Sequence, residues 1–458
     1  MTSSAATLEL PWDRGAFPTV GPHQAYLVGG SVRDLLLDRQ PFDLDLAVAG
    51  DPAAFARRLA DLAGGRLIAL GKPELMLYRV VCGQRVVDIA AIAGGGITAD
   101  LNRRDFTINA LAVDVASGGV IDVCGGRADL AAGRVRMVSP AAFEQDPVRL
   151  IRAFRMAAVL GFAIDPETAA TVGEKAALIT RPAAERVRSE LLKILDTALA
   201  ADALTRMAAC GLLPALLPEL AALGGGRMAH TLMAIAELET LLGRPQALIP
   251  VGIAPGIWSP AAIPAGLLKL ALLLHELGRP SPEGQGRGRL GKPAVKNDAV
   301  AAICARLKLS NRQARYLDVI TRGHRRLPWL FEAYRRRRLS DRVLARFFMA
   351  GGGRTPDLFF HAAADAAAGD GERPGQAFAG FARDALHRYF TEFLPRRAAP
   401  PLLTGRDLVE LLGLTPAPLF KSVLTRIETE RLAGRLHTKD EAIGRAEEFL
   451  QDRPAGRR

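Results

Sequence analysis

The sequence predicts an α+β protein in which a small mixed sheet near the N-terminus precedes a long all-helical region. Up to about Val138, short apolar runs that alternate with polar residues or end in glycine pairs are typical of strands. From Ala142 almost to the end, apolar residues recur at helical spacing. The chain of 458 residues is too long for one compact core, so we expect two to four domains.

The individual elements follow from local patterns. We expect strands at Ala25–Val28, Leu44–Val48 and Arg85–Ala90, and a helix at Val32–Leu37. Glycine and proline clusters predict breaks at Gly94–Gly96, Gly224–Gly226, Pro280–Pro293 and Gly369–Pro374, and Pro400-Pro401 introduces a last helical segment. We therefore expect residues 1–140 to hold the sheet, and helical parts to cover residues 141–200, 201–345 and 346–458.

The charge balance fits a polyanionic partner. The 60 Lys and Arg against 48 Asp and Glu give a net charge of +12 and a sequence pI near 10.0. A GC-rich genome that favours Arg and Ala codons is the alternative explanation, so charge alone does not establish nucleic-acid binding.

Cysteine use and hydropathy bear on the compartment. The four cysteines lie far apart and form no CxxC pair, which favours small buried hydrophobes in a reducing cytoplasm over a zinc site or disulfides. Residues 1–22 lack a secretory pattern, and the longest apolar runs, such as Leu270–Leu274, are too short to span a bilayer. We expect a cytoplasmic protein without a membrane segment.

A glycine pair closes the first predicted strand. In Gly29-Gly30-Ser31-Val32-Arg33-Asp34, a strand that ends in Gly-Gly and opens a helix lets backbone N–H groups approach a phosphate. The helix N-terminus and Arg33 add positive charge there. Such a glycine pair is more often purely structural, so this motif decides nothing by itself.

Two carboxylates follow on the next predicted strand. Residues i and i+2 of a strand face the same side, so Asp43 and Asp45 project together, roughly 7 Å apart. This spacing suits two divalent cations roughly 4 Å apart, one activating an attacking hydroxyl and one holding a triphosphate. Adjacent like charges on an apolar strand are costly without cations. An isolated Asp-x-Asp is nevertheless more often a solvated sheet edge.

Together these motifs resemble the nucleotidyltransferase head of the polymerase-β superfamily. More closely, Tyr26–Val48 resembles class II tRNA nucleotidyltransferases and bacterial poly(A) polymerases. The resemblance implies a polymerase-β-like head in which Asp43 and Asp45 hold two Mg²⁺ ions, followed by a helical neck, body and tail. It places Asp88 where the family often has a third acidic residue near the metals. An ordinary polar residue at a strand end is the equally open alternative for Asp88.

A second family block, RRDFTINALA, spans Arg103–Ala112. Arg103 and Arg104 suit phosphate groups, while Asp105 and Asn109 suit bonds to sugar hydroxyls or hold the loop in place. A chance basic turn would not carry the whole string.

A third block, QDPVRLIRAFR, begins at Gln145, where the family has Glu. Asp146, Arg149, Arg152 and Arg155 recur every three residues, which predicts a basic stripe along one helix. In the family the matching Asp and Arg pair with the Watson–Crick edge of the incoming base, and the resemblance gives this role to Asp146 and Arg149. The chemistry fits, because a carboxylate accepts from an amino group and a guanidinium donates to a carbonyl. Arg152 and Arg155 are expected to neutralise phosphates.

A fourth block, Glu185–Leu191, matches the helical motif that follows the base-reading helix in the family. Glu185 and Arg188 are i,i+3 partners. For Glu185, Arg186 and Arg188, bracing of the helix is at least as well supported as contact with substrate.

The sequence departs from the family between Asp88 and Arg103. Relatives usually have a longer flexible loop there, which helps to switch from adding C to adding A, whereas only Ile89–Asn102 remains in this chain. Enzymes of the family with a shortened loop tend to add only CC, and some add tails. The short loop therefore argues against complete CCA synthesis.

The region around His230 and Leu274–Gly278 resembles an HD phosphohydrolase domain that is fused to some relatives. That chemistry needs a His-Asp pair, but Glu276 replaces the Asp, and Asp298 or His324 are the candidates to complete a site. A single His on an apolar helix is usually a core residue whose ring nitrogens have hydrogen-bond partners. We therefore expect a degenerate helical domain.

The later helical parts are expected to bind RNA. Arg335–Arg338 is a candidate basic surface, with a solvated helix face as an even alternative. Leu402–Leu408, Leu412–Leu414, Gly434 and Thr438–Ala442 resemble the tail of HD-fused relatives. That likeness implies contact with an RNA acceptor stem through shape and phosphates.

The resemblance as a whole implies a template-independent RNA nucleotidyltransferase. It would add C, A or both, from CTP and ATP, to the 3′ ends of tRNA or other RNA, with two Mg²⁺ ions as cofactors. A poly(A) polymerase is the alternative within this class. A catalytically inactive RNA-binding protein and an HD phosphohydrolase are the alternatives outside it, disfavoured by the Asp43/Asp45 pair and by Glu276 respectively. No obligate protein partner is expected.

Overall fold

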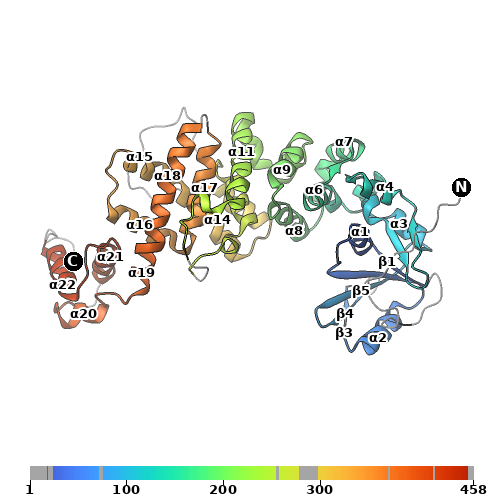
Figure 1. The fold of residues 1–458 in the computed structure, drawn as a ribbon, viewed down its shortest axis with the longest axis horizontal. Coiled ribbons are helices and arrows are strands. Elements are labelled where there is room, and N and C mark those ends of the chain that lie inside the picture. Colours follow the sequence, from blue (N-terminus) through green and yellow to red (C-terminus); the bar gives the residue numbers. More distant parts are fainter. Residues whose placement is uncertain are drawn as a thin grey trace. The chain divides into compact units, whose positions relative to one another are not determined.

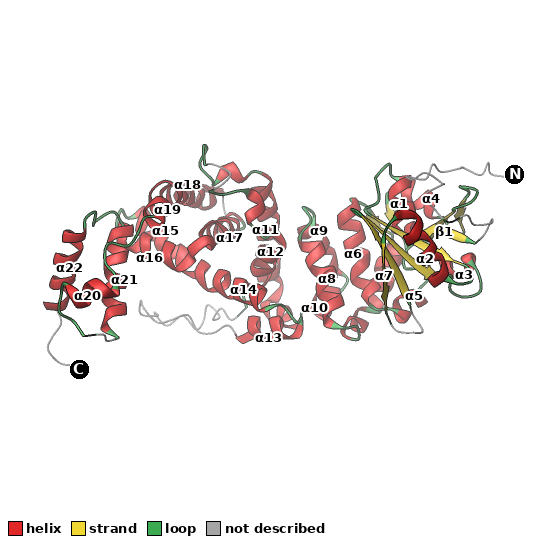
Figure 2. Cartoon of the chain, turned by 90° about the horizontal axis from the view of Figure 1, so that it is seen from below, coloured by secondary structure: helices red, strands yellow, loops and turns green. Residues whose placement is uncertain are grey.

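The computed structural model describes residue 18 and residues 24–71, 76–253, 257–277, 298–369, 372–415 and 418–451. The chain separates into two compact units, Met1–Pro218 and Glu219–Arg458. All strands in the described residues belong to the first unit, and the second is helical (Figure 2). The predicted α+β class is therefore confirmed. The predicted break at Pro280–Pro293 and the end Arg453–Arg458 fall outside the described residues.

A seven-stranded mixed sheet lies in the N-terminal part of the first unit (Figure 1). Its strands are β1 Ala25–Val28, β2 Asp43–Val48, β3 Arg66–Leu70, β4 Leu77–Cys82, β5 Arg85–Ala91, β6 Leu111–Asp114 and β7 Val120–Asp122. They lie in the order β3-β4-β5-β2-β1-β6-β7. Strands β2 and β5 run parallel, and the other neighbours are antiparallel. The central pair β2 and β5 carries the acidic residues of the predicted site.

The predicted strands and helix agree with the structure to within two residues. The helix α1 spans Gly30–Leu36, two residues earlier than predicted, because Gly29 adopts a left-handed φ of 71° and turns the chain directly into the helix. Helix α2, Pro52–Ala63, is capped by Asp51, whose carboxylate accepts from the amides of Ala53 and Ala54. Helix α2 packs on β3, β4 and β5.

The short helix α3, Ile97–Asn102, packs on the sheet at β1 and β6. Its Leu101 is fully buried against Tyr26, Val28 and Ala112 of β1 and β6. Apolar burial of this kind stabilises the fold by roughly 25 cal/mol per Å² of surface removed from water. The helix therefore holds the Arg103–Ala112 segment, which follows it directly, against the sheet.

Helices dominate the rest of the first unit. They are α4 Gly126–Ala131, α5 Ala141–Gln145, α6 Val148–Leu160, α7 Pro166–Glu174, α8 Ala184–Leu195, α9 Ala200–Ala209 and α10 Leu212–Leu216. A two-stranded parallel ladder of β8, Arg134–Val135, and β9, Ala163–Ile164, lies among them. The prediction that strands end near Val138 is wrong for β9, because two residues are too few to show an alternating pattern. Helix α6 packs on α8 and α9.

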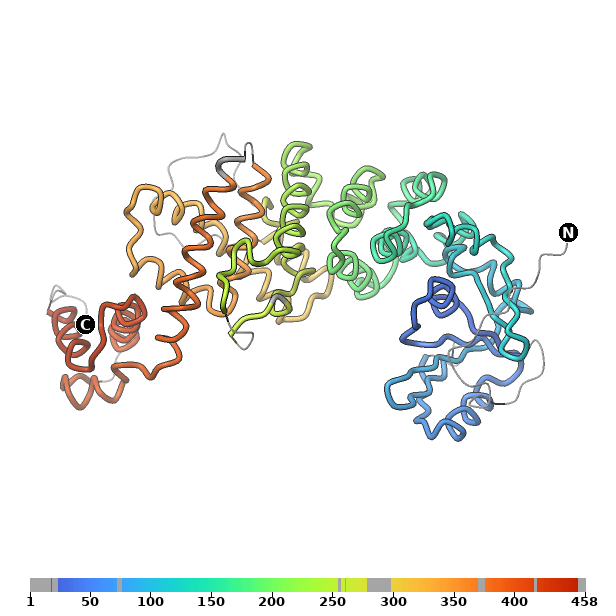
Figure 3. The backbone as a smooth tube through the Cα atoms, viewed as in Figure 1, coloured from blue at the N-terminus to red at the C-terminus, as the bar shows by residue number. Residues whose placement is uncertain are grey.

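The second unit is a stack of helices (Figures 1 and 3). They are α11 Gly224–Gly243, α12 Ala265–Leu274, α13 Asp298–Arg306, α14 Asn311–Gly323, α15 Leu327–Arg335, α16 Asp341–Gly351, α17 Thr355–Ala367, α18 Glu372–Arg388, α19 Leu394–Ala398, α20 Gly405–Glu410, α21 Leu419–Leu432 and α22 Lys439–Gln451. Helix α17 packs on α11, α12, α14 and α18. Leu408, Val423, Ile427, Ala442 and Ala446 form a separate small core for α20, α21 and α22.

The predicted breaks in this unit are confirmed in part. Gly224 takes a φ of 70° where α11 begins, but the two glycines after it lie within the helix. A glycine inside a helix costs about 1 kcal/mol relative to alanine, and the packing of α11 on α12 and α17 offsets this cost. The break after Gly369 is present, although α18 already starts at Glu372. Within the residues that the structure describes, no helix has the length and apolar character needed to cross a membrane.

Candidate active site

Three carboxylates meet at the centre of the sheet. The parallel register of β2 and β5 places Asp45 directly beside Asp88, while Asp43 is opposite Val86. Neighbouring strands are about 4.8 Å apart, so Asp45 and Asp88 are close on one face, and Asp43 lies on that same face two residues away. The sequence-predicted third carboxylate is therefore beside the predicted pair.

The Asp45 carboxylate is in an electrostatically unfavourable place. Burial raises its pKa, the neighbouring Asp88 raises it further and Asp43 adds to the effect, whereas Arg104 and Arg152 lower it. A group in this position favours its protonated form unless positive charge arrives. A cluster of hard carboxylate oxygens that repel one another suits divalent cations such as Mg²⁺, so these residues fit the ions that the sequence implied.

Ser31 fixes the Asp43–Asp45 strand, and sequence reasoning gave it no role. Its buried hydroxyl donates to the carbonyl of Asp43 at 3.1 Å and accepts from the amide of Asp45 at 3.0 Å. These two bonds join the first turn of α1 to β2. The signal in the sequence was the small hydroxyl residue directly after the glycine pair.

Arg79 was also missed. Its guanidinium lies on β4 opposite Asp88 and donates two bonds to that carboxylate, at 2.7 and 2.8 Å. Bidentate pairs of this type are strong and directional. Because the pair joins residues nine apart across a hairpin, only the strand register reveals it. Arg79 therefore competes with a cation for the lone pairs of Asp88.

The glycine pair and the arginines form one side of the site. A Cβ at Gly29 would lie 2.8 Å from Nη1 of Arg104 and 3.8 Å from a carboxylate oxygen of Asp45, so a side chain there would collide with the site. Arg104 is held by Asp100 at 2.9 Å. Arg103 is exposed beside it. The structure thus brings Gly29, Asp45 and Arg104 together.

The Arg103–Ala112 block contributes a chain of polar contacts. The buried Asp105 accepts from the Asn109 side chain at 3.0 Å and forms an ion pair with Arg152 at 2.8 Å. The amide oxygen of Asn109 accepts from Arg33 at 2.8 Å. This chain connects α1, the block itself and α6. Asp105 and Asn109 therefore position arginines.

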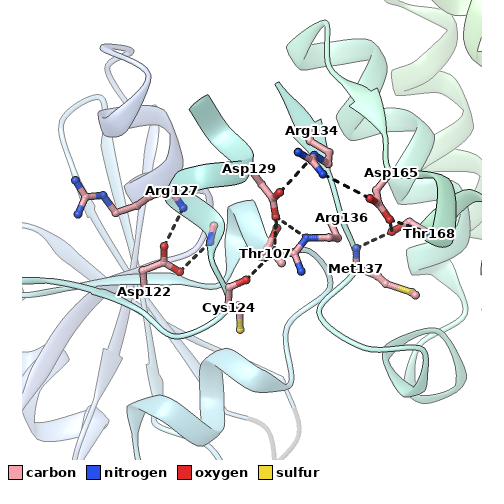
Figure 4. Close-up of polar contacts among 11 residues, drawn as sticks. Thr107, Asp122, Cys124, Arg127, Asp129, Arg134, Arg136, Met137, Asp165 and Thr168 are labelled. Atoms are coloured by element: carbon pink, nitrogen blue, oxygen red, sulfur yellow. Dashed lines mark hydrogen bonds and ion pairs between the residues drawn. The ribbon is translucent and has the colours of Figure 1, made fainter. Parts of the chain in front are cut away.

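A second network of hydrogen bonds and ion pairs holds the Arg103–Ala112 block in place (Figure 4). Thr107 donates to Asp129 at 2.6 Å, and Asp129 also accepts from Arg136 at 2.8 Å. Gly126 packs so tightly that a Cβ would lie 2.2 Å from the Thr107 carbonyl. Any larger residue at position 126 would push the block out of position. Glycine is therefore required here, because the backbones of residues 126 and 107 lie so close together.

Asp146 lies between α5 and α6, and Arg149 lies in the first turn of α6. Asp146 accepts two bonds from Arg186 of α8, at 3.1 and 2.7 Å. Arg149 donates to the Ala142 carbonyl at 3.2 Å, and burial lowers its pKa, although a guanidinium stays charged at any physiological pH. The carboxylate is thus oriented by a residue forty positions away. Arg186 therefore fixes the orientation of Asp146, the residue predicted to recognise the base.

Arg155 has a different environment from the rest of the stripe. It forms an ion pair with Glu190 of α8 at 2.6 Å, and both side chains are mostly buried. Burial lowers its pKa, and Glu190 opposes that effect. This geometry favours bracing of α6 against α8. Contact of Arg155 with phosphate stays a prediction.

Comparison with protein families and with individual proteins found similar sequences over most of the chain. The model of the "Poly A polymerase head domain" family matches residues 25–136, and that of the "Probable RNA and SrmB- binding site of polymerase A" matches residues 161–223. A CC-adding tRNA nucleotidyltransferase of Thermus thermophilus is 34% identical over 93% of this chain and 94% of that protein. An A-adding tRNA nucleotidyltransferase of Deinococcus radiodurans is 32% identical over 94% and 97%.

Solved structures with a similar fold cover nearly the whole chain. A CCA-adding enzyme in complex with ATP gives a TM-score of 0.68 at 21% identity, over 95% of this chain and 92% of that chain. A Thermotoga maritima CCA-adding enzyme complexed with tRNA gives 0.65 at 22% identity, over 94% and 91%. At this level of sequence identity, the similarity shows a shared fold and nothing more.

Proposed function

We propose that this chain, which belongs to the tRNA nucleotidyltransferase family, adds two cytidines to the 3′ end of tRNA and then stops. The observation that carries the choice of CC is the short connection between β5 and α3, where only residues 92–96 lie outside the two elements. So short a segment leaves little freedom for the rearrangement that a change from C to A requires. An A-adding relative of similar identity makes single A addition the competing outcome.

The reaction would use the three carboxylates and the neighbouring arginines. The 3′-hydroxyl oxygen of the RNA would form a bond to the α-phosphorus of CTP and release its proton to water, the bond from that phosphorus to the oxygen shared with the β-phosphate would break, and pyrophosphate would leave with the electrons of that bond. Two Mg²⁺ ions, held by Asp43 and Asp45, would supply charge neutralisation and activate the hydroxyl. Arg104 and Arg152 would stabilise the negative charge that accumulates on the phosphates.

The free cysteines of the described chain accord with a cytoplasmic location.

Nucleotide addition to three tRNA transcripts tests this proposal. The transcripts end before the tail, after C, and after CC, and each is incubated with Mg²⁺ and labelled CTP or ATP, then separated on a sequencing gel. We expect two cytidines on the first transcript, one on the second and none on the third, with no adenosine on any. Addition of A to the CC transcript would contradict CC specificity, long A tails would indicate a poly(A) polymerase, and no addition at all would contradict the enzyme class.

Base choice provides a second prediction. Replacing Asp146 with Ala removes the acceptor for the cytosine amino group, so we expect the ratio of kcat/KM for CTP over UTP to fall by roughly 10- to 100-fold, since a good bidentate base contact contributes about 1–3 kcal/mol of discrimination. The ratio is measured on the transcript that lacks the tail. Asp202, an exposed residue of α9 that pairs with Arg206, is the matched control for an Asp to Ala change. An unchanged ratio for the Asp146 variant would exclude it from base recognition.

A further inference from the structure

An arginine and two aspartates lie in one row across three neighbouring strands of the sheet. The register places Arg79 of β4 opposite Asp88 of β5, and Asp88 opposite Asp45 of β2. Directly opposite residues project from the same face of a sheet, so all three side chains lie on the face that also carries Asp43. The row therefore places one positive and two negative charges beside the predicted cation site.

The Arg79 guanidinium engages both carboxylate oxygens of Asp88. Its Nε donates to Oδ1 at 2.7 Å, and its Nη2 donates to Oδ2 at 2.8 Å. The planar fork of a guanidinium matches a carboxylate in this way and fixes its orientation. The bidentate side of Asp88 therefore faces Arg79, and a cation beside Asp45 can reach only the outer lone pairs of Asp88.

The charge of Arg79 also acts on the other two carboxylates. The pKa of Arg79 is raised, chiefly by its hydrogen bonds to Asp88 and by the charge of that residue, and to a smaller extent by the charges of Asp43 and Asp45. The Arg79 side chain is 38% exposed and that of Asp88 is 13% exposed, so the guanidinium lies at the open side of the pair. A positive charge fixed there repels an entering cation.

We propose that Arg79 is a positioning residue that keeps Asp88 from binding the metal ions, so that Asp43 and Asp45 hold these ions weakly until a nucleoside triphosphate binds. Mg²⁺ is usually held by one or two carboxylates together with the phosphates of a substrate. A third free carboxylate would bind the ions before any phosphate arrived. The proposal rests on the metal site of the proposed function, but not on the choice of C over A.

Binding of Mn²⁺ to the full-length chain, without RNA or nucleotide, tests this role of Arg79. Mn²⁺ takes oxygen ligands as Mg²⁺ does, and free Mn²⁺ is measured by its electron paramagnetic resonance signal. Each protein is compared with the same protein carrying Asp43→Asn and Asp45→Asn, whose binding is subtracted. The subtraction is needed because the second unit also brings possible ligand atoms together, from His230, His275, Glu276 and Asp365.

We expect Arg79→Gln to bind Mn²⁺ at least about tenfold more tightly than the parent, since the charge count of the ligands sets the affinity of carboxylate sites. Arg79→Lys keeps the positive charge but loses the fork, so we expect its binding to be tighter than that of the parent by about threefold or more. A purely structural ion pair would leave the affinity unchanged or lower it when broken. A role of the charge alone would leave Arg79→Lys at the parental affinity.

Arg85→Gln, at an exposed arginine of β5, is the matched control and should bind Mn²⁺ like the parent. Six paired positions join β4 and β5, so both Arg79 variants are expected to fold, which circular dichroism checks. Binding by Arg79→Gln that is no tighter than that of the parent, or parental binding by Arg79→Lys, would overturn the proposal. Nucleotide addition by the parent in either case would show that the proposed function stands without it.

Discussion

Replacing Asp45 with Asn is expected to reduce the rate of nucleotide addition by about 10³-fold or more, because charge stabilisation by metal ions contributes several kcal/mol to the transition state and each 1.36 kcal/mol is a factor of ten. Asn keeps the shape of the side chain and its backbone bond to Ser31. Only the negative charge beside Asp88 is lost. The rate of CTP addition to a tRNA transcript that lacks the tail is the measurement.

The stability of the same variant separates lost chemistry from lost folding. The pKa of Asp45 is raised in the folded chain, chiefly by burial and then by Asp88. Ionised Asp45 therefore destabilises the fold fully at pH values above its folded pKa, and this penalty shrinks as the pH falls below that value and is gone below the unfolded pKa. We expect the Tm of Asp45→Asn without Mg²⁺, at neutral pH, to equal or exceed that of the parent.

Addition of Mg²⁺ should make the Tm of the parent higher than that of Asp45→Asn, because an ion that binds only the folded state raises the Tm of the parent and not of the variant. Asp61→Asn, at an exposed position of α2, is the control and should behave as the parent in rate and in both Tm values. Retention of the parental rate by Asp45→Asn would remove Asp45 from the chemistry. Collapse of its Tm without Mg²⁺ would show that the residue is structural.

The sequence predicted those parts of the fold that local patterns determine. β1, β2 and β5 are apolar or alternating runs of four to seven residues, and glycine marks the end of β1. Strand β3 was not predicted, since it lies at the sheet edge with both of its ends exposed and shows no clear alternation. Strand β6 was not predicted, because Leu111–Asp114 is short and its first two residues belong to the Arg103–Ala112 motif block.

The same distinction applies to the site. Asp43 and Asp45 share a strand, so their spacing alone placed them on one face. The residues that hold the site come from elsewhere: Arg79 reaches Asp88 across a hairpin, and Arg186 reaches Asp146 from another helix. Contacts between distant segments depend on register and helix packing, which a single sequence does not encode in any short pattern.

The ion pair between Arg155 and Glu190 leads to the largest expected effect on stability. Replacing Glu190 with Ala leaves a mostly buried guanidinium without its partner at 2.6 Å. Breaking a buried pair costs about 3–5 kcal/mol, and we expect about 3 kcal/mol because both side chains keep some exposure. Urea unfolding of the parent and the variant measures the difference. Glu174→Ala, at an exposed position of α7, should change stability by less than about 0.5 kcal/mol.

A double variant then decides what Arg155 does. Arg155→Met together with Glu190→Leu replaces the pair by apolar groups that fill the space between α6 and α8, so most of the stability should return. If Arg155 only braces the helices, the KM for CTP of this variant should equal that of the parent. A KM raised tenfold or more in the refolded, stable double variant would instead assign Arg155 to phosphate binding. A loss of stability as large as that of Glu190→Ala would show that the charge itself is needed for the packing of α6 on α8.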